Sequence, residues 1–157
     1  MKLKKIVILL VCLFSSGMLS AQNGVIRIYK GNSTYSGNTI YTFDGRYVYK
    51  GRSTYSGNVL YTYDGHYLYK GRTTYSGSVL YTYDGQYLYK GRSRYSGSTI
   101  LTFDGQYVYR GRGTYSGNVL YTYDGRHVFK GRSTYSGSII YTTDAPVPLP
   151  VLYAICF

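Results

Sequence analysis

Basic side chains recur every twenty residues along most of this chain, and they are the groups best suited to chemistry with a partner. In each copy a lysine or arginine precedes a glycine, and in five of the six copies a second cation follows that glycine. The candidate anion-binding residues are Lys30, Lys50, Arg52, Lys70, Arg72, Lys90, Arg92, Arg110, Arg112, Lys130 and Arg132. Ammonium and guanidinium groups in such numbers attract anions, so the pattern predicts binding of anionic lipid headgroups, acidic glycans or phosphate polymers. A solvated surface that only keeps the protein soluble is the alternative.

A tyrosine follows each basic group at a fixed distance, in the segment x-Y-S-G that connects one apolar run to the next. These tyrosines are Tyr35, Tyr55, Tyr75, Tyr95, Tyr115 and Tyr135. Aromatic rings held in loops are suited to stacking on sugars or enclosing a quaternary ammonium group. They therefore offer an aromatic binding surface as an alternative to the basic one. A structural role, in which each ring wedges neighbouring hairpins together, is the other interpretation.

Groups that could carry out catalysis are scarce. The chain has no glutamate, and its six aspartates all occupy the same position of the repeat. Its two histidines, His66 and His127, stand at different repeat positions, and no His, Cys or Asp cluster has metal-ligand spacing. No convergent acid, base or nucleophile can be nominated, so we expect neither an enzyme nor a bound metal or cofactor.

The first 21 residues have the composition of a signal peptide. MKLKK is a basic segment, IVILLVCLF an apolar one, and SSGMLSA a small-residue stretch that suits cleavage after Ala21. A membrane anchor is the alternative, but the apolar run is shorter than the roughly 20 residues of a spanning helix. The sequence therefore predicts a secreted, periplasmic or cell-surface protein without a transmembrane span in its mature chain.

Removal of this segment changes both the charge and the cysteine count. Loss of Lys2, Lys4 and Lys5 from 18 basic side chains leaves 15 against 6 acidic ones, a formal charge of +9. Such an excess favours anionic partners, although export argues against nucleic acid. Only Cys156 remains, so no internal disulfide is available and strand pairing must close the fold.

The twenty-residue period indicates a repeat of β-hairpins. Each Asp-Gly pair lies between two runs of β-branched and aromatic residues, and such a pair is typical of a two-residue type I′ turn. That turn would place Tyr63 opposite His66 and Tyr61 opposite Leu68. Strands of five or six residues follow. One sheet face should look into a closed interior, and neighbouring hairpins should partly cover the other.

The two ends of the repeat region complement each other. VIRIYKG (25–31) matches the second strand of a unit, and SIIYTTD (138–144) matches the first strand. Their pairing would complete a sixth hairpin and close twelve antiparallel strands into an all-β barrel without exposed edges. An open ladder of hairpins is the alternative. Closure would gather the aspartates on one rim and the basic groups on the other.

A closed ring of twelve strands has a backbone diameter of about 18 to 22 Å, so something must fill it. The apolar tail APVPLPVLYAICF (145–157) leaves the repeat at a proline-rich segment, and Pro150 is compatible with the start of a short helix. We expect this tail to turn inward and plug the ring. Tyrosine side chains from every unit could also fill it, and a tail that stays outside as a flexible apolar end is the alternative. The predicted organisation is a signal peptide (1–21), a repeat domain (22–144) and an apolar tail (145–157).

The repeat itself resembles that of bacterial β-flower proteins, in which short hairpins radiate as petals around an axis. The resemblance is clearest at YKGNSTYSGNTIYTFDG (29–45) and recurs through SGSIIYTTD (136–144). It implies a domain of six hairpin units, which together with the signal peptide and the lack of catalytic groups we expect to act as an exported, non-enzymatic binding or envelope-structural module. It also implies a distant likeness in shape to tubby-like barrels, which cradle an apolar helix and include lipid-headgroup binders. A structural or adhesive surface protein, with tyrosine-mediated packing or glycan contact, remains the alternative.

Overall fold

The computed structural model describes residues 24–157, so the expected signal peptide (1–21) lies outside the described residues. Short strands with β-branched and aromatic side chains make up the repeat region, as the composition of the apolar runs predicts. The strands are β1 (Ile26–Lys30), β2 (Thr39–Phe43), β3 (Tyr47–Lys50), β4 (Val59–Tyr63), β5 (Tyr67–Lys70), β6 (Val79–Tyr83), β7 (Tyr87–Lys90), β8 (Thr99–Phe103), β9 (Tyr107–Arg110), β10 (Val119–Tyr123), β11 (His127–Lys130) and β12 (Ile139–Thr143).

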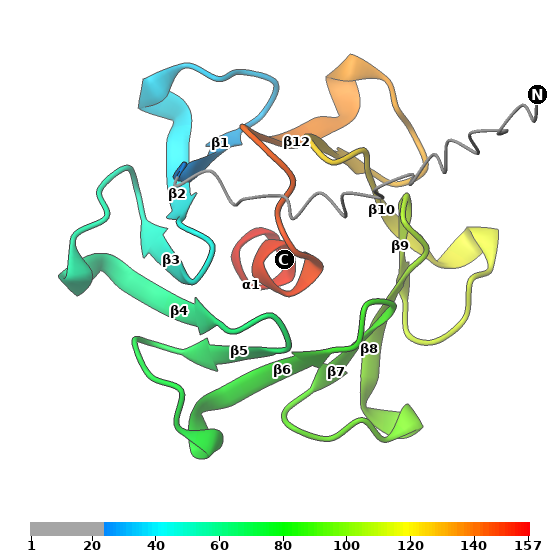
Figure 1. Ribbon diagram of the computed structural model, residues 1–157. Helices are drawn as coiled ribbons and strands as arrows, with labels where there is room; N and C mark the ends of the chain where they lie inside the picture. Colours follow the sequence, from blue (N-terminus) through cyan, green and yellow to red (C-terminus); the bar gives the residue numbers. More distant parts are fainter. Residues whose placement is uncertain (1–23) are drawn as a thin grey trace, which may run out of the picture.

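The strands form one closed antiparallel barrel in which every strand pairs with its neighbours in sequence. The ring closes where β1 pairs with β12, with Ile28 opposite Thr143 and Lys30 opposite Tyr141. Figure 1 shows these two strands side by side and the hairpins arranged around a common axis. The expected twelve-stranded barrel with paired terminal strands is confirmed, and the open ladder is excluded.

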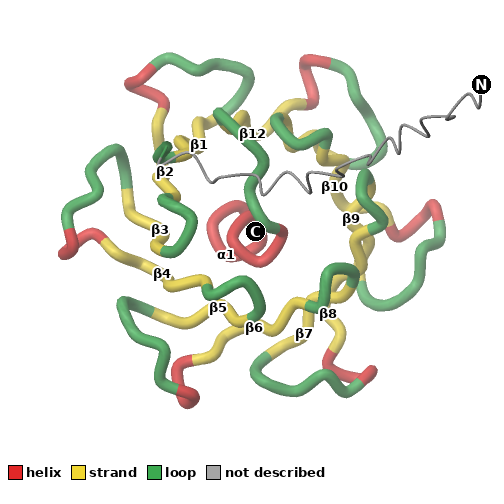
Figure 2. Tube along the Cα trace, in the orientation of Figure 1, coloured by secondary structure: helices red, strands yellow, loops and turns green. Residues whose placement is uncertain are grey.

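Each odd strand connects to the next even strand by a loop that contains one turn of 3-10 helix. These turns lie at the outer ends of the petals (Figure 2). They are η1 (Ser36–Asn38), η2 (Ser56–Asn58), η3 (Ser76–Ser78), η4 (Ser96–Ser98), η5 (Ser116–Asn118) and η6 (Ser136–Ser138). The strand pairs that these loops join carry a register shift, for example between Val48 and Tyr49. Such bulges increase local twist and help a sheet of short strands to curl into a ring.

The Asp-Gly turns differ from the expected type I′ geometry. Tyr63 pairs with Leu68 and Tyr61 with Lys70, so the register is displaced by two residues from the prediction. Gly65 has a φ of 96°, but no residue other than glycine has positive φ in the described part of the chain. Asp64 therefore precedes the turn instead of occupying its centre. Because the displacement is even, the side chains still divide between the two faces as expected.

The aspartate carboxylate organises each turn by accepting hydrogen bonds. Asp64 accepts from the amides of His66 (2.9 Å) and Tyr67 (2.6 Å) and from the Tyr69 hydroxyl (2.8 Å). Partial burial alone would raise the pKa of Asp64, but these bonds outweigh it and hold the pKa below its ordinary value. The pKa is lowered in the same way at Asp84, Asp104 and Asp124.

The two faces of the sheet have different partners. Tyr63 and Leu68 point inward and belong to the apolar core. On the other face the buried Thr62 donates to the Gly71 carbonyl, which satisfies a hydroxyl that would be costly to bury alone. All six units repeat this bond at 2.7 to 2.8 Å, in the pairs Thr42–Gly51, Thr62–Gly71, Thr82–Gly91, Thr102–Gly111, Thr122–Gly131 and Thr142–Gly31.

The apolar tail forms a helix, α1 (Leu149–Cys156), which occupies the centre of the ring (Figure 1). Pro150 lies in its first turn, where a missing N–H costs no intrahelical bond. Val151 and Leu152 are buried among the inward-facing strand residues. The expected plug is therefore confirmed. No helix within residues 24–157 combines the length and apolarity that a bilayer crossing would require.

Shortening a buried side chain of the plug should destabilise the barrel. Leu152 is 2% exposed, so Leu152→Ala should lower the free energy of unfolding by about 2 to 5 kcal/mol through lost burial and a residual cavity. Chemical denaturation followed by circular dichroism measures this. Thr54→Ala, at an exposed loop position, is the control and should stay within about 0.5 kcal/mol of the wild type. Equal effects of the two substitutions would contradict a structural plug.

The aspartate turns should make stability sensitive to acid. Because the folded-state pKa of Asp64 lies below its unfolded value, its carboxylate stabilises the fold above that unfolded value. This contribution is lost as pH falls through the folded-state pKa. Asp64→Asn should therefore be less stable at neutral pH and lose less stability between about pH 5 and pH 2. Tyr69→Phe removes one of the three donors and should give a smaller effect of the same sign. An unchanged acid dependence in Asp64→Asn would disprove this role.

Candidate functional site

Six of the predicted basic residues stand at the same end of the barrel. Each is the last residue of an odd strand, and the odd strands of a closed antiparallel ring all run in one direction. The aspartate turns occupy the opposite end. We call this group the cationic mouth, and its members are Lys30, Lys50, Lys70, Lys90, Arg110 and Lys130. All six residues are exposed.

The cationic mouth surrounds a partly buried aromatic floor. Directly opposed residues of an antiparallel pair share one face, so Lys70 lies on the same inner face as Tyr61. Five of the six cations oppose a tyrosine in this way, while Arg110 opposes Leu101. The other opposed pairs are Lys30–Tyr141, Lys50–Tyr41, Lys90–Tyr81 and Lys130–Tyr121.

The carboxyl end of α1 reaches this floor. The Phe157 ring stacks on Tyr121 at a centroid distance of 3.8 Å and remains 42% exposed. Tyr121 opposes Lys130 across the β10–β11 pair, and burial is the main cause that raises the pKa of its phenol. The negative end of the helix dipole therefore lies among cations, an arrangement that stabilises the plugged ring.

The five predicted arginines lie in the loops that follow the odd strands and form a second group. Four of them stack on a tyrosine that begins an odd strand of the preceding unit, at 4.9 to 5.5 Å from the guanidinium carbon to the ring centroid. The pairs are Arg72–Tyr47, Arg92–Tyr67, Arg112–Tyr87 and Arg132–Tyr107. The fifth, Arg52, is exposed, and the position equivalent to those tyrosines is Arg27. The expected rim of eleven cations is thus divided into two sets.

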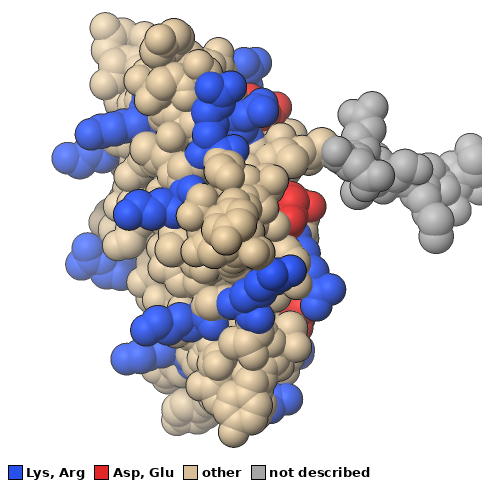
Figure 3. Space-filling view, turned by 90° about the vertical axis from the view of Figure 1, so that its left-hand side faces the viewer, with Lys and Arg blue, Asp and Glu red and all other residues tan. Residues whose placement is uncertain are grey.

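Figure 3 shows the ring from the side. Lys and Arg side chains project from one side of the ring, and the aspartates lie on the other side among further cations. Within residues 24–157 the one contact at ion-pair distance joins the His127 ring to the Asp124 carboxylate at 3.0 Å. No carboxylate within the described chain therefore neutralises the cationic mouth at ion-pair distance. This leaves its charges available to a partner.

The six loop tyrosines are the most exposed large hydrophobic residues of the described chain, with 69 to 76% of each residue accessible. They do not wedge the hairpins together. Instead, the ring of Tyr55 lies against Gly57, where an added Cβ would be only 2.6 Å from the ring. The same contact occurs in four other units, whereas Tyr115 packs against Gly113 and leaves Gly117 free of contacts. The outer face of each ring remains open to solvent.

The repeat also breaks at one point on the aspartate rim. Arg94 replaces the threonine of the other loops, and its guanidinium contacts the His66 ring from the neighbouring unit. These two residues line a cleft with Tyr63, Tyr83 and Asp84. In the sequence, Arg94 and His66 differ from the residues at the equivalent positions of other units. Their contact with each other becomes apparent only in the structure.

The potential metal ligands are scattered over the described part of the chain. No group of three His, Cys, Asp or Glu side chains lies close enough to hold a metal ion in residues 24–157. Burial raises the pKa of the Cys156 thiol to about 12, so the thiol stays protonated and unreactive at neutral pH. What the surface offers is positive charge and exposed aromatic rings, which are means of binding.

The loop tyrosines provide a test with a control inside the chain. Gly57→Ala should displace the Tyr55 ring, because the new methyl group would collide with it. Gly117→Ala should leave Tyr115 in place and stabilise the protein by about 0.4 to 1 kcal/mol, since alanine restricts the unfolded chain. Ring resonances in NMR spectra and the free energy of unfolding measure both effects. Equal shifts of the two rings would contradict the described packing.

The chain was compared with protein families, curated proteins and solved structures. Neither the curated proteins nor the solved structures gave a match. The family described as 6-fold beta flower protein matches residues 28–152, which include eleven complete strands, most of β1 and the first half of α1. This match agrees with the six hairpin units, the closure of β1 on β12 and the twelve strands described above. The chain therefore belongs to the 6-fold beta flower family.

Proposed function

We propose that this protein is an exported, non-enzymatic binding module that recognises an anionic component of the cell envelope through its cationic mouth. Lipid headgroups and acidic glycans are the candidate ligands. Secretion to the periplasm or cell surface follows from the predicted signal peptide. The binding step needs no covalent chemistry, because charge attraction and contact with the aromatic floor supply the free energy.

The observation that supports this proposal is the convergence of six exposed cations around one end of a rigid barrel. They lie across from the aspartates, and no carboxylate of the described chain lies within ion-pair distance of them. Each basic residue near an anionic surface contributes about 1 kcal/mol. Individually weak contacts therefore add up when one extended polyanion or membrane surface meets the mouth.

The exposed loop tyrosines favour a second candidate function. Six solvent-exposed tyrosine rings, in the loops that form the petals, could join copies of the protein or hold glycans by stacking. A structural or adhesive surface protein would use them. This association would depend weakly on ionic strength, whereas binding at the cationic mouth would be screened by salt.

Cosedimentation with vesicles and glycans separates the two functions. The protein should bind anionic vesicles or an acidic glycan, and ignore neutral vesicles, at about 0.1 M salt. Binding should fall steeply at about 1 M salt, where the Debye length shrinks from about 10 to 3 Å. Retention of binding at high salt would favour the tyrosines, and failure to bind any anionic probe would remove the first function.

Matched substitutions test the location of the site. Neutralising Lys50, Lys70 and Lys90 to Gln removes three charges of the mouth and should weaken binding about 100-fold, at about 1 kcal/mol each. Neutralising Arg52, Arg92 and Arg132 to Gln removes the same net charge from the loops and should have a much smaller effect. Equal losses in both variants would show that net charge alone governs binding.

A further inference from the structure

An exposed aromatic side chain lies among the cations of the mouth. Figure 1 places the carboxyl end of α1 at the centre of the ring, and the six basic residues that end the odd strands surround that centre. Phe157 stacks on Tyr121 at a centroid distance of 3.8 Å, and Tyr121 opposes Lys130. Even so, 42% of Phe157 stays accessible to solvent. The cationic mouth therefore presents an apolar ring inside a circle of positive charge.

The exposure of Phe157 sets it apart from the rest of the plug. Val151, Leu152 and Ile155 are buried in the core. Besides the loop tyrosines, Val25 is the other exposed large hydrophobic residue of the described chain. Val25 precedes β1, whose first residue pairs with Phe43 beside an aspartate turn, so it lies at the opposite end of the barrel. The exposed phenyl ring is thus a feature of the mouth.

The aromatic floor around Phe157 has the character of a membrane interface. Tyr81, Tyr121 and Tyr141 are half-buried, and burial is the main cause that raises the pKa of each phenol. These rings therefore stay uncharged at neutral pH. Tyrosines with an apolar body and a polar hydroxyl are enriched where lipid headgroups meet hydrocarbon. Lysines suit the same region, because the apolar stem can be buried while the ammonium group reaches phosphate or water.

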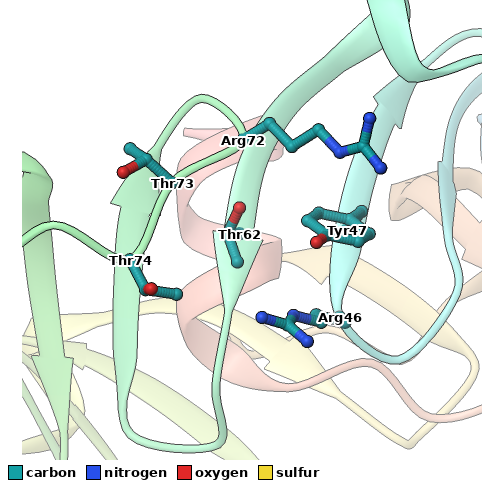
Figure 4. A pocket seen from close by; sticks show the side chains of 6 residues that line it. All are labelled: Arg46, Tyr47, Thr62, Arg72, Thr73 and Thr74. Atoms are coloured by element: carbon teal, nitrogen blue, oxygen red, sulfur yellow. The ribbon is translucent and has the colours of Figure 1, made fainter.

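The arginines of the loops are placed differently. Arg72 stacks on Tyr47 with its guanidinium carbon 5.4 Å from the ring centroid, and Arg46 lies on the opposite side of that ring (Figure 4). Tyr47 directly opposes Thr62, so both belong to the outer face of the barrel wall. A flat partner that meets the mouth end-on does not need this face. The mouth, with its central Phe157, is therefore the docking surface.

We propose that the cationic mouth docks on an anionic lipid bilayer, with its cations at the headgroup phosphates and the Phe157 ring inserted into the interfacial region. This inference rests on the function proposed above and selects a lipid surface over a soluble polyanion. A partner that meets all six cations and the central ring at once must be broad and flat. A single glycan chain crosses the mouth along one line and leaves the remaining cations in water. Charge attraction holds the protein at the surface, and burial of the phenyl ring adds to it.

The chain allows an optical test because it contains no tryptophan. Phe157→Trp places a single indole at the mouth, and Gln86→Trp places one at an exposed turn of the aspartate rim. The chain is used without residues 1–21, whose apolar segment would itself enter vesicles. With phosphatidylglycerol vesicles at about 0.1 M salt, the emission of Phe157→Trp should shift to the blue and be quenched by brominated acyl chains. Gln86→Trp should bind equally well and keep its emission unchanged.

Matched apolar substitutions measure the contribution of the ring. Phe157→Ala should bind the same vesicles about three- to tenfold more weakly, because the exposed part of the phenyl ring is no longer buried in lipid. Phe157→Leu keeps an apolar side chain and should restore most of the affinity. Val25→Ala removes a comparably exposed residue, 37% accessible, from the opposite end and should bind like the wild type. Equal losses in Phe157→Ala and Val25→Ala would contradict insertion, and circular dichroism confirms that each variant folds.

The outcomes separate this inference from the function on which it rests. Binding to anionic vesicles without any change in the emission of Phe157→Trp would retain the mouth as an anion site and overturn insertion. Binding to heparin, a soluble acidic glycan, but not to the vesicles would likewise overturn the choice of a lipid surface. Failure to bind either probe would remove both proposals. Salt-sensitive vesicle binding that quenches the indole at position 157 alone is the expected result.

Discussion

The first and last strands come from opposite ends of the repeat region, and the hydrogen bonds between them turn a row of hairpins into a ring. Asp144 takes the place of the turn aspartates at this junction. It accepts from the Arg27 amide at 3.1 Å and the Tyr29 hydroxyl at 3.0 Å, bonds that other units form within one hairpin. The sixth turn is thus rebuilt from two chain segments. Without it, two strand edges would be exposed and the basic residues would no longer surround a common axis.

Ring and plug stabilise each other. A helix of eight residues such as α1 is too short to be stable alone in water, because nucleation costs more than so few hydrogen bonds return. Inside the ring its buried face contacts residues such as Leu68 and Val48, which would otherwise line a void. Strands of four or five residues are also unstable in isolation. Closure creates the space that the helix fills, and the helix supplies the core that makes closure favourable.

The repeat period, the complementary ends and the apolar tail were sufficient to predict the closed barrel and its plug. These features depend on pattern and on the cost of exposed edges, both of which can be read from residue types. The turn was predicted incorrectly because Asp64 uses its side chain as an acceptor, a choice that an Asp-Gly pair does not reveal. The arginine stacks were missed for another reason. Arg72 and Tyr47 are 25 residues apart and meet only when neighbouring units pack, so their distance in sequence gives no signal.

Departures from the repeat separate structural from functional requirements. At Phe129 the hydroxyl that bonds the turn aspartate is missing, and His127 supplies a replacement donor to Asp124 at 3.0 Å. This change preserves the fold, so it needs no functional explanation. Glutamine replaces Arg46 at equivalent turns, and the turn bonds through the backbone amide of that residue in either case. The fold therefore does not fix the residue at this position. The mouth is different, because its cations recur in every unit, and six equivalent contacts favour an extended or repeating anion over a small one.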